Sequence, residues 1–273
     1  MTLTLTSFMM MAIAVRELAD HIAVFEILVF RSLGGLILLL PFIIYFGISQ
    51  ISTSRLKLHC VRHSVHFAAQ YFWFLALTLL PLAEVFALEF TAPIWVILIA
   101  AIFLKEPLNY ARVIAVAGGF AGVLVILRPG IEIIDPVAII VLASAFGFAC
   151  SLVLTKVLTR TDTPMAIIFY MSVFQAPLSM TLAYHDWYWP GWNDLLWVII
   201  IGVAGNTAHY SMARALKIAD ASVIFPMDFL RVPLIAVVGY LIYSESLDLW
   251  VVAGGSYNIS RQLFPDSKGK CRS

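Results

Sequence analysis

The chain has 273 residues, of which 62% are hydrophobic and 12% charged, with a formal net charge of +1. Soluble domains are nearer half apolar and a quarter charged, so this composition excludes an ordinary water-soluble protein. The mean hydropathy of +0.96 points the same way. We therefore expect an all-α membrane protein whose main surroundings are the lipid bilayer. We expect no nucleic-acid partner.

Apolar segments long enough to cross a bilayer recur along the chain. A helix needs about 20 residues to cross a hydrocarbon core of ~30 Å. Six segments reach or nearly reach that length: 24–46, 82–103, 110–127, 135–155, 164–184 and 222–243. Two more, 64–80 and 195–213, carry polar residues, and two end segments, 3–15 and 247–256, are short. The sequence predicts ten transmembrane helices, the first and last short or truncated.

An internal repeat divides these helices into two halves. At an offset of 139 positions, residues 69–108 align with 208–247 without a gap, and eight of the forty pairs are identical. The identical pairs are Ala69/Ala208, Tyr71/Tyr210, Ala76/Ala215, Leu77/Leu216, Phe86/Phe225, Phe90/Phe229, Glu106/Glu245 and Leu108/Leu247. Related helices are five crossings apart, so the second copy runs in the opposite direction, as in many secondary transporters. We expect a five-plus-five inverted repeat with halves at 1–128 and 135–256.

The last part of the second half is unlike the first. The repeat projects the fifth helix onto 249–266, but the sequence turns polar after Ser256. The second half of the tenth helix looks deleted, and residues 257–273 form a polar tail that we place in the cytoplasm. A truncated, non-transporting remnant or an assembly partner is therefore the alternative to a working transporter.

Basic residues are distributed unevenly between the two sides of the ten-helix topology. One side carries thirteen and the other only Arg16 and Arg128, while Arg31 and Arg231 lie within helices. The thirteen are Arg55, Lys57, Arg62, Lys105, Arg112, Lys156, Arg160, Arg214, Lys217, Arg261, Lys268, Lys270 and Arg272. Lys and Arg accumulate in cytoplasmic loops. We predict a multi-pass protein of the cell (inner) membrane with both termini in the cytoplasm.

Several motifs resemble one transporter family. They include Gly118-Gly-Phe-Ala-Gly-Val-Leu-Val-Ile-Leu-Arg-Pro-Gly130, Phe103-Leu-Lys-Glu-Pro107 and Asp228-Phe-Leu-Arg-Val-Pro233. With them the chain resembles the EamA-domain branch of the drug/metabolite transporter superfamily over about residues 8–256. The second half is similar to members that take up S-adenosylmethionine or riboflavin. The resemblance implies ten helices around a central cavity lined from both halves, and the polar stretch after Ser256 departs from it.

Charged residues inside the apolar segments are candidates for the solute site. Glu89 lies in the middle of segment 82–103, where an ionised carboxylate costs several kcal/mol unless it is paired, protonated or hydrated. It either faces the cavity or is a structural acid bonded to a neighbouring helix. Asp228 and Arg231 are three residues apart and share a helical face, so they can pair. Arg31 has no local partner, and Glu89 is one candidate.

Polar and aromatic residues at repeated positions complete the candidate site. The repeat pairs Gln70 with His209 and Tyr71 with Tyr210. Together with Trp73 and Asn206, they suit a flat solute that stacks on rings and hydrogen-bonds at its edge. The alternative is that these side chains only pack and bond between helices. Pro93 and Pro233 are expected to interrupt their helices at nearly equivalent places.

No pattern in the sequence points to an enzyme, and we expect none, with no cofactor and no metal. P-loop, Gly-x-Ser-x-Gly and His-Glu-x-x-His motifs are absent. His59, His63 and His66 share a helical face, but no acid or cysteine completes a zinc set except Cys60, on another face. The sequence therefore favours a secondary active transporter of a small organic metabolite by alternating access. Proton or ion coupling and a homodimer stay open.

Overall fold

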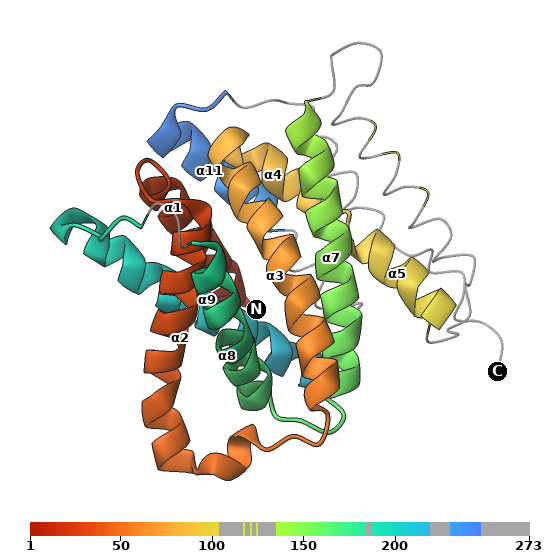
Figure 1. Ribbon diagram of the computed structural model, residues 1–273. Coiled ribbons are helices and arrows are strands. Elements are labelled where there is room, and N and C mark those ends of the chain that lie inside the picture. Colours follow the sequence, from red (N-terminus) through yellow and green to blue (C-terminus); the bar gives the residue numbers. More distant parts are fainter. Residues whose placement is uncertain are drawn as a thin grey trace.

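A computed structural model describes residues 1–103, 135–183, 187–218 and 230–246, together with positions 117, 121 and 124. Every regular element of these residues is a helix, as Figure 1 shows, so the all-α prediction is confirmed for them. Apart from those three positions, the predicted helix 110–127 lies outside the described residues, as do the predicted helix 247–256, the tail 257–273 and Asp228.

The described helices follow the predicted segments closely. They are α1 (Thr2–Leu18), α2 (Val24–Phe46), the 3-10 turn η1 (Ile48–Ile51), α3 (Leu56–Leu79), α4 (Leu82–Glu89), α5 (Ala92–Phe103), α7 (Pro136–Leu158), α8 (Pro164–Leu182), α9 (Trp192–Ile218) and α11 (Arg231–Tyr243). Local sequence fixes two of the starts. Asp135 accepts a hydrogen bond from the Val137 amide at 2.8 Å, and Thr163 accepts one from Ala166 at 3.0 Å. A proline follows each cap, as is common at helix starts.

Five of the described stretches are long and apolar enough to cross a membrane. They are Val24–Phe46, Leu82–Phe103, Pro136–Leu158, Pro164–Leu182 and Trp192–Ala215. Helix α3 is longer, with 24 residues, than the predicted segment 64–80. The helix begins at Leu56, but its first turns carry histidines and an arginine. An apolar criterion does not count these residues and therefore places the start later. The prediction was therefore wrong at this start.

The fourth predicted helix is interrupted in its middle. Helix α4 ends at Glu89, and α5 begins at Ala92. The cause is Pro93, which lacks an N–H and whose ring excludes the carbonyl four residues earlier, that of Glu89. The interruption expected at Pro93 is present, and it puts Glu89 at a helix end within the apolar segment.

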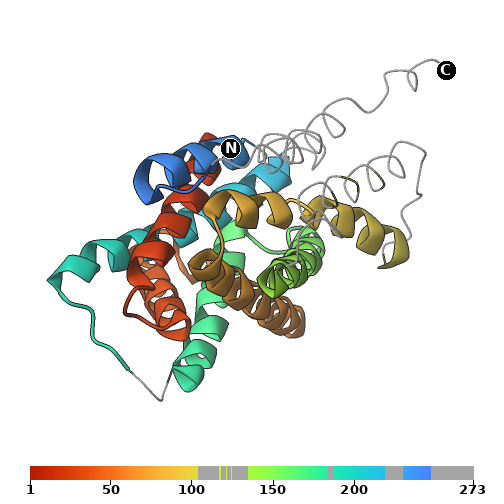
Figure 2. The ribbon, with the colours of Figure 1, turned by 90° about the horizontal axis from the view of Figure 1, so that it is seen from above.

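The helices pack in pairs that join the two predicted halves. Helix α1 packs against α9 and α3 against α7, while α2 packs on α8 and α4 on α11 (Figures 1 and 2). Close approach requires a glycine at one contact, because a Cβ on Gly147 of α7 would lie 2.8 Å from the Cβ of Ala69 on α3. Small residues at such contacts are typical of membrane helices.

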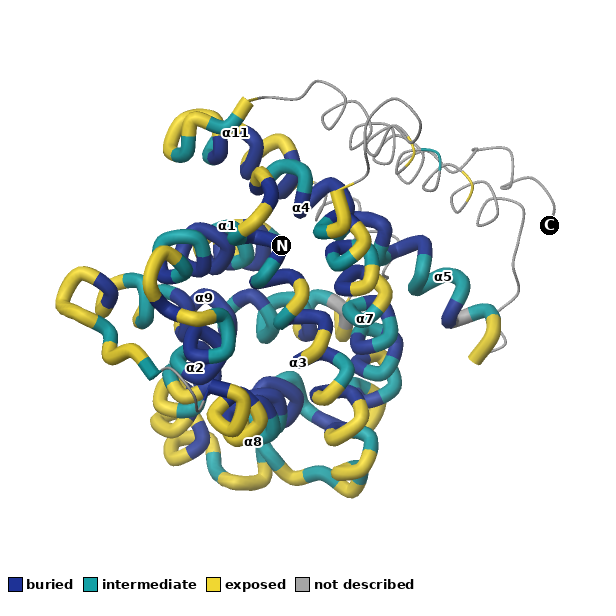
Figure 3. Tube along the Cα trace, turned by 45° about the horizontal axis from the view of Figure 1, so that its top comes forward, coloured by how far each residue is buried: buried dark blue, intermediate teal, exposed yellow. Residues whose placement is uncertain are grey.

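Burial follows the same arrangement. The largest apolar core lies between α1, α3, α4 and α9, where Leu18, Phe74, Leu77 and Phe86 are buried. Large apolar side chains also cover the outer faces of α2 and α11, where Figure 3 shows exposed residues. Ile44, for example, is 80% exposed. Apolar surface of this kind suits contact with lipid.

Candidate functional site

A cavity of about 120 Å³ lies inside the helix bundle. Its wall takes residues from both predicted halves, including α1, α3, α4 and α5 of the first and α7, α8, α9 and α11 of the second. Much of the wall is apolar, but six lining side chains are charged, imidazole or amide groups: Arg62, His66, Gln70, Glu89, His209 and Arg231. A set of polar side chains that lines a cavity inside an apolar bundle is what we expect of a solute site.

Glu89 contacts Trp73 and Arg231 in the cavity wall. The indole Nε1–H of Trp73 donates a 2.8 Å hydrogen bond to Glu89 Oε2, and Arg231 Nη2 lies 3.5 Å from Glu89 Oε1. The Arg231 guanidinium also lies over the rings of Phe8 and Phe90, 4.5 and 5.0 Å from their centroids. These contacts compensate the carboxylate with a hydrogen bond and an opposite charge.

The arginine beside Glu89 is therefore Arg231, and the candidate pairing of Glu89 with Arg31 was wrong. Arg31 Nη1 instead donates to Gln175 Oε1 of α8 at 3.2 Å. The predicted pairing of Arg231 with Asp228 involves a residue outside the described part of the chain. It stays a prediction.

Gln70 contributes an amide to the cavity wall. Its side chain is 1% exposed, and neither Oε1 nor Nε2 has a hydrogen-bond partner among the described residues. A buried polar group left without a partner costs about 1–3 kcal/mol. The amide offers one acceptor and one donor side by side. It is therefore suited to a ligand that carries the complementary pair.

Two histidines lie next to this amide in the cavity wall. His66 on α3 and His209 on α9 have ring centroids 4.9 Å apart. His66 Nδ1 lies 3.0 Å from Gln175 Nε2, while its Nε2 has no partner among the described residues. Together with Gln70, they give the cavity several hydrogen-bonding atoms from α3 and α9.

Three further candidates do not line the cavity. Tyr71 stacks on Phe25, with centroids 4.2 Å apart, and Tyr210 packs beside Leu39 and Met171 in a separate cluster. Asn206 Nδ2 donates to the Gly35 carbonyl at 2.8 Å and so joins α9 to α2.

We expected these side chains to converge with Gln70 and His209, but in the structure they lie outside the cavity that Gln70 and His209 line. Adjacent residues are about 100° apart around a helix of 3.6 residues per turn. Tyr71 therefore faces away when Gln70 faces the cavity, and the same holds for Tyr210 beside His209.

Arg62 is a cavity residue that was not among the predicted site residues. It was counted among loop cations, but it lies within α3, is 4% exposed and lines the cavity. Its spacing carried a signal: Arg62, His66, Gln70 and Trp73 follow one another at intervals of four, four and three. Such spacing places all four on one helical face. The described residues contain no group of three His, Cys, Asp or Glu arranged to hold a metal.

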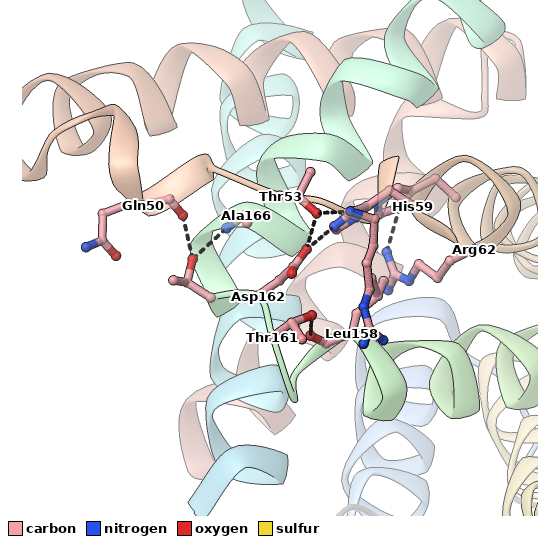
Figure 4. Close-up of polar contacts among 11 residues, drawn as sticks. Gln50, Thr53, His59, Arg62, Leu158, Thr161, Asp162 and Ala166 are labelled. Carbon is pink, nitrogen blue, oxygen red and sulfur yellow. Dashed lines mark hydrogen bonds and ion pairs between the residues drawn. The ribbon is translucent and has the colours of Figure 1, made fainter. Parts of the chain in front are cut away.

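Polar contacts close the bundle at both ends of α3. At its last turn, Arg16 and Glu245 form an ion pair of 2.9 Å, and nearby His21 Nε2 lies 2.8 Å from Asp194 Oδ1. At its first turn, His59 Nε2 lies 2.7 Å from Asp162 Oδ2 (Figure 4). Each contact joins residues of the first half to residues of the second.

The carboxyl group of Asp162 is held in its ionised form. Burial by itself would raise its pKa, but hydrogen bonds from Thr53, His59 and Thr161 outweigh that effect and lower the pKa below its usual range. The Thr53 hydroxyl donates at 2.6 Å (Figure 4). A negative charge is therefore fixed at this end of the bundle.

Comparison with known proteins identifies the family. The EamA-like transporter family, part of the drug/metabolite transporter superfamily, matches the chain over residues 1–128 and 136–257. The chain belongs to the EamA-like transporter family. The resemblance seen in the motifs is confirmed. As a family member with several long apolar helices, this EamA-like transporter is a multi-pass membrane protein.

Several curated relatives of this EamA-like transporter are named after a solute. It is 26% identical over 249 residues to an S-adenosylmethionine uptake transporter of Rickettsia prowazekii, covering 91% of this chain and 85% of that protein. It is 32% identical over 244 residues to a riboflavin transporter of Brucella anthropi, covering 84% of each. A solved crystal structure has a TM-score of 0.68 at 18% identity and covers 98% of this chain and 96% of its own, which shows the shared fold.

Proposed function

We propose that the chain is a secondary active transporter that moves a small organic metabolite with a flat heteroaromatic ring across the inner membrane by alternating access. The observation that carries this proposal is the cavity, in which the unpartnered Gln70 amide lies on the same helix face as Trp73, close to Glu89 and Arg231. Buried ionisable groups of this kind usually mark solute or ion pathways.

The lining chemistry favours a heteroaromatic solute. A side-chain amide pairs well with a ring edge that offers one donor and one acceptor, as Asn and Gln do with adenine. Phe8, Phe90 and Trp73 supply ring surfaces, and the cavity also holds a carboxylate and two guanidinium groups. S-adenosylmethionine and riboflavin, which the relatives' names give as solutes, both carry a flat fused ring with such an edge.

The helix contacts support an inverted repeat. If α1, α2, α3 and α4 correspond to α7, α8, α9 and α11, exchanging the halves turns the contact of α1 with α9 into that of α7 with α3. Both contacts are extensive. The contacts of α2 with α8 and of α4 with α11 map onto themselves, and both are present. Such two-fold exchange suits rocking of one half against the other around a central site.

The orientation is part of the same proposal. The distribution of basic residues, twelve to two once the buried Arg62 is subtracted from the thirteen, supports a cytoplasmic side for both termini and for the end of the bundle near His59 and Asp162. The end near Arg16 and Glu245 then faces the outside.

Uptake into proteoliposomes tests the function. Radiolabelled S-adenosylmethionine, riboflavin, nucleosides and amino acids are offered to the purified chain, and accumulation is compared with empty liposomes. We expect accumulation of at least one ring-bearing solute, reduced at least tenfold in Gln70→Leu and unchanged in Tyr71→Phe. Tyr71 is the matched control because it lies on the same helix but stacks on Phe25. No accumulation of any solute, or equal uptake by Gln70→Leu, contradicts the proposal.

A further inference from the structure

A continuous chain of hydrogen bonds leads from the cavity wall to the end of the bundle. Arg62 Nη1 lies 2.8 Å from His63 Nδ1, His63 Nε2 lies 3.3 Å from His59 Nδ1, and His59 Nε2 lies 2.7 Å from Asp162 Oδ2. All four side chains are buried, with both histidines at 0% exposure. Figure 4 shows the His59, Arg62 and Asp162 part of this chain. Of the four residues, Arg62 also lines the cavity.

The chemistry of the end groups fixes the position of every hydrogen in this chain. Arginine stays protonated in proteins and only donates, so His63 Nδ1 must accept. A neutral imidazole then carries its hydrogen on Nε2 and donates it to His59 Nδ1. His59 in turn carries its hydrogen on Nε2 and donates to the Asp162 carboxylate. The two neutral histidines thus connect a buried cation to a buried anion, with every hydrogen bond pointing the same way.

One added proton reverses the hydrogen bond between the two histidines. A second hydrogen on His59 occupies Nδ1, which improves its contact with Asp162 but now donates toward His63 Nε2. His63 must accept there and move its own hydrogen to Nδ1. That hydrogen faces the N–H of Arg62, so two donors meet and the Arg62–His63 hydrogen bond is lost. The guanidinium is then left with a donor that has no acceptor in the histidine chain.

We propose that Arg62 and the His59–His63 pair form a proton-coupled anion site, in which uptake of one proton by the histidines releases Arg62 to bind a carboxylate or similar anionic group of a ligand in the cavity. One proton enters and one negative charge binds, so the net charge of the protein–ligand complex does not change. The inference concerns binding and holds whether or not the chain transports.

Neighbouring groups define the electrostatics of this site. The titratable or charged side chains around the pair are Arg31 of α2, Arg62 and His66 of α3, Asp162 before α8, Tyr170 of α8 and His209 of α9. Burial most strongly opposes a positive charge on the histidines, and Arg62 and Arg31 oppose it further, whereas Asp162 favours one on His59. Binding of an anion beside Arg62 offsets the opposing charge, so the proton and the anion favour each other's binding.

Nitrogen NMR of the histidines tests the proton half. The full-length protein, labelled with ¹⁵N-histidine in lipid nanodiscs, has six histidines, which single His→Asn variants assign. At high pH we expect the hydrogen on Nε2 of both His59 and His63. On acidification His59 should become doubly protonated while His63 changes to the Nδ1–H form. A hydrogen on Nδ1 of His63 at high pH, or no change in either ring down to the pH of unfolding, overturns the proposal.

Binding of benzoate tests the anion half, with benzamide as the neutral control. Benzoate has one apolar ring and one carboxylate, and calorimetry gives its affinity at several pH values. One-proton linkage predicts that benzoate affinity falls about tenfold for each pH unit above the histidine midpoint, whereas benzamide affinity stays constant. His63→Asn removes the imidazole that connects His59 to Arg62, so it should remove the pH dependence. His21→Asn, at the opposite end of α3, should retain it.

Three results would contradict this half of the proposal. They are benzoate affinity that does not depend on pH, the same pH dependence in His63→Asn, and no benzoate binding at any pH. A transport failure would leave all of these binding measurements intact, so the two proposals fail separately.

Discussion

Arg16 near the end of α1 and Glu245 after α11 form an ion pair with 2.9 Å between Nη2 and Oε1. The same two side chains hold the connection between α3 and α4. Arg16 Nη1 donates to the carbonyls of Leu77 and Leu80 at 2.6 and 2.8 Å, and Glu245 Oε2 accepts the Leu82 amide at 2.9 Å. Arg16 thus satisfies carbonyls at the end of α3, and Glu245 satisfies an amide at the start of α4.

This ion pair should contribute measurably to stability. Arg16→Gln and Glu245→Gln each leave a charged partner with an incomplete set of contacts. Because the two side chains are 23% and 11% exposed, we expect a coupling of about 1 kcal/mol in a double-mutant cycle. Unfolding of the four proteins in mixed micelles with increasing SDS measures it. The exposed Asp20→Asn variant is the control, and a coupling of zero would show that the pair is not stabilising.

The apolar segments predicted most of the helix boundaries, but not the start of α3, whose first turns are polar. The segment 24–46 corresponds to α2 without correction because it is strongly apolar along its length, with Glu26 and Arg31 as its charged residues. The predicted start of α3 lay too far along the chain because His59, Arg62 and His63 are polar, and a hydropathy criterion assigns polar residues to loops. In the structure each of the three is buried against other helices. Burial by neighbouring helices is a tertiary effect that local composition does not contain.

The candidate site could be predicted only in part. Glu89 was identified by its depth in an apolar segment, which is a property of the sequence alone. Its partner was not, because both Arg31 and Arg231 were available and only the packing of α4 against α11 places Arg231 beside it. The repeat suggested Tyr71 and Tyr210, but repetition preserves core packing as well as ligand contacts, and those two rings pack outside the cavity.

The stability of the protein should fall in acid through Asp162. The pKa of this carboxyl is lower in the folded protein than in the unfolded chain, so its contribution is fully present above the unfolded pKa of about 4. It is lost progressively as the pH falls through the lower, folded value. We expect the melting temperature to decrease below about pH 4, with a smaller decrease in Asp162→Asn. Equal pH profiles for both proteins would show that Asp162 does not contribute.

Both termini should lie in the cytoplasm. The charge asymmetry, twelve to two once the buried Arg62 is subtracted from the thirteen, predicts this orientation. Alkaline phosphatase and fluorescent-protein fusions at Ser273 and within residues 185–193 should report opposite sides of the membrane. If both sites report the same side, the ten-helix topology is wrong.

Glu89 should be essential to any transport by this chain. In Glu89→Gln an amide oxygen can still accept the Trp73 indole hydrogen, but the charge beside Arg231 is lost. A carboxylate that carries a proton or binds a solute cation supplies a few kcal/mol, so we expect initial uptake to fall tenfold or more. Uptake per molecule of protein in the membrane is the measurement, with protein level checked by immunoblot.

Companion variants separate this role from a purely structural one. Arg231→Gln should reduce uptake as Glu89→Gln does, because it breaks the same pair from the other side. Arg31→Gln should mainly lower the amount of folded protein, since Arg31 bonds to Gln175 rather than to Glu89. Tyr71→Phe should change neither quantity. If Glu89 were only a structural acid, its amide would replace it well, and uptake by Glu89→Gln at the wild-type rate per molecule would refute the role assigned to this carboxylate.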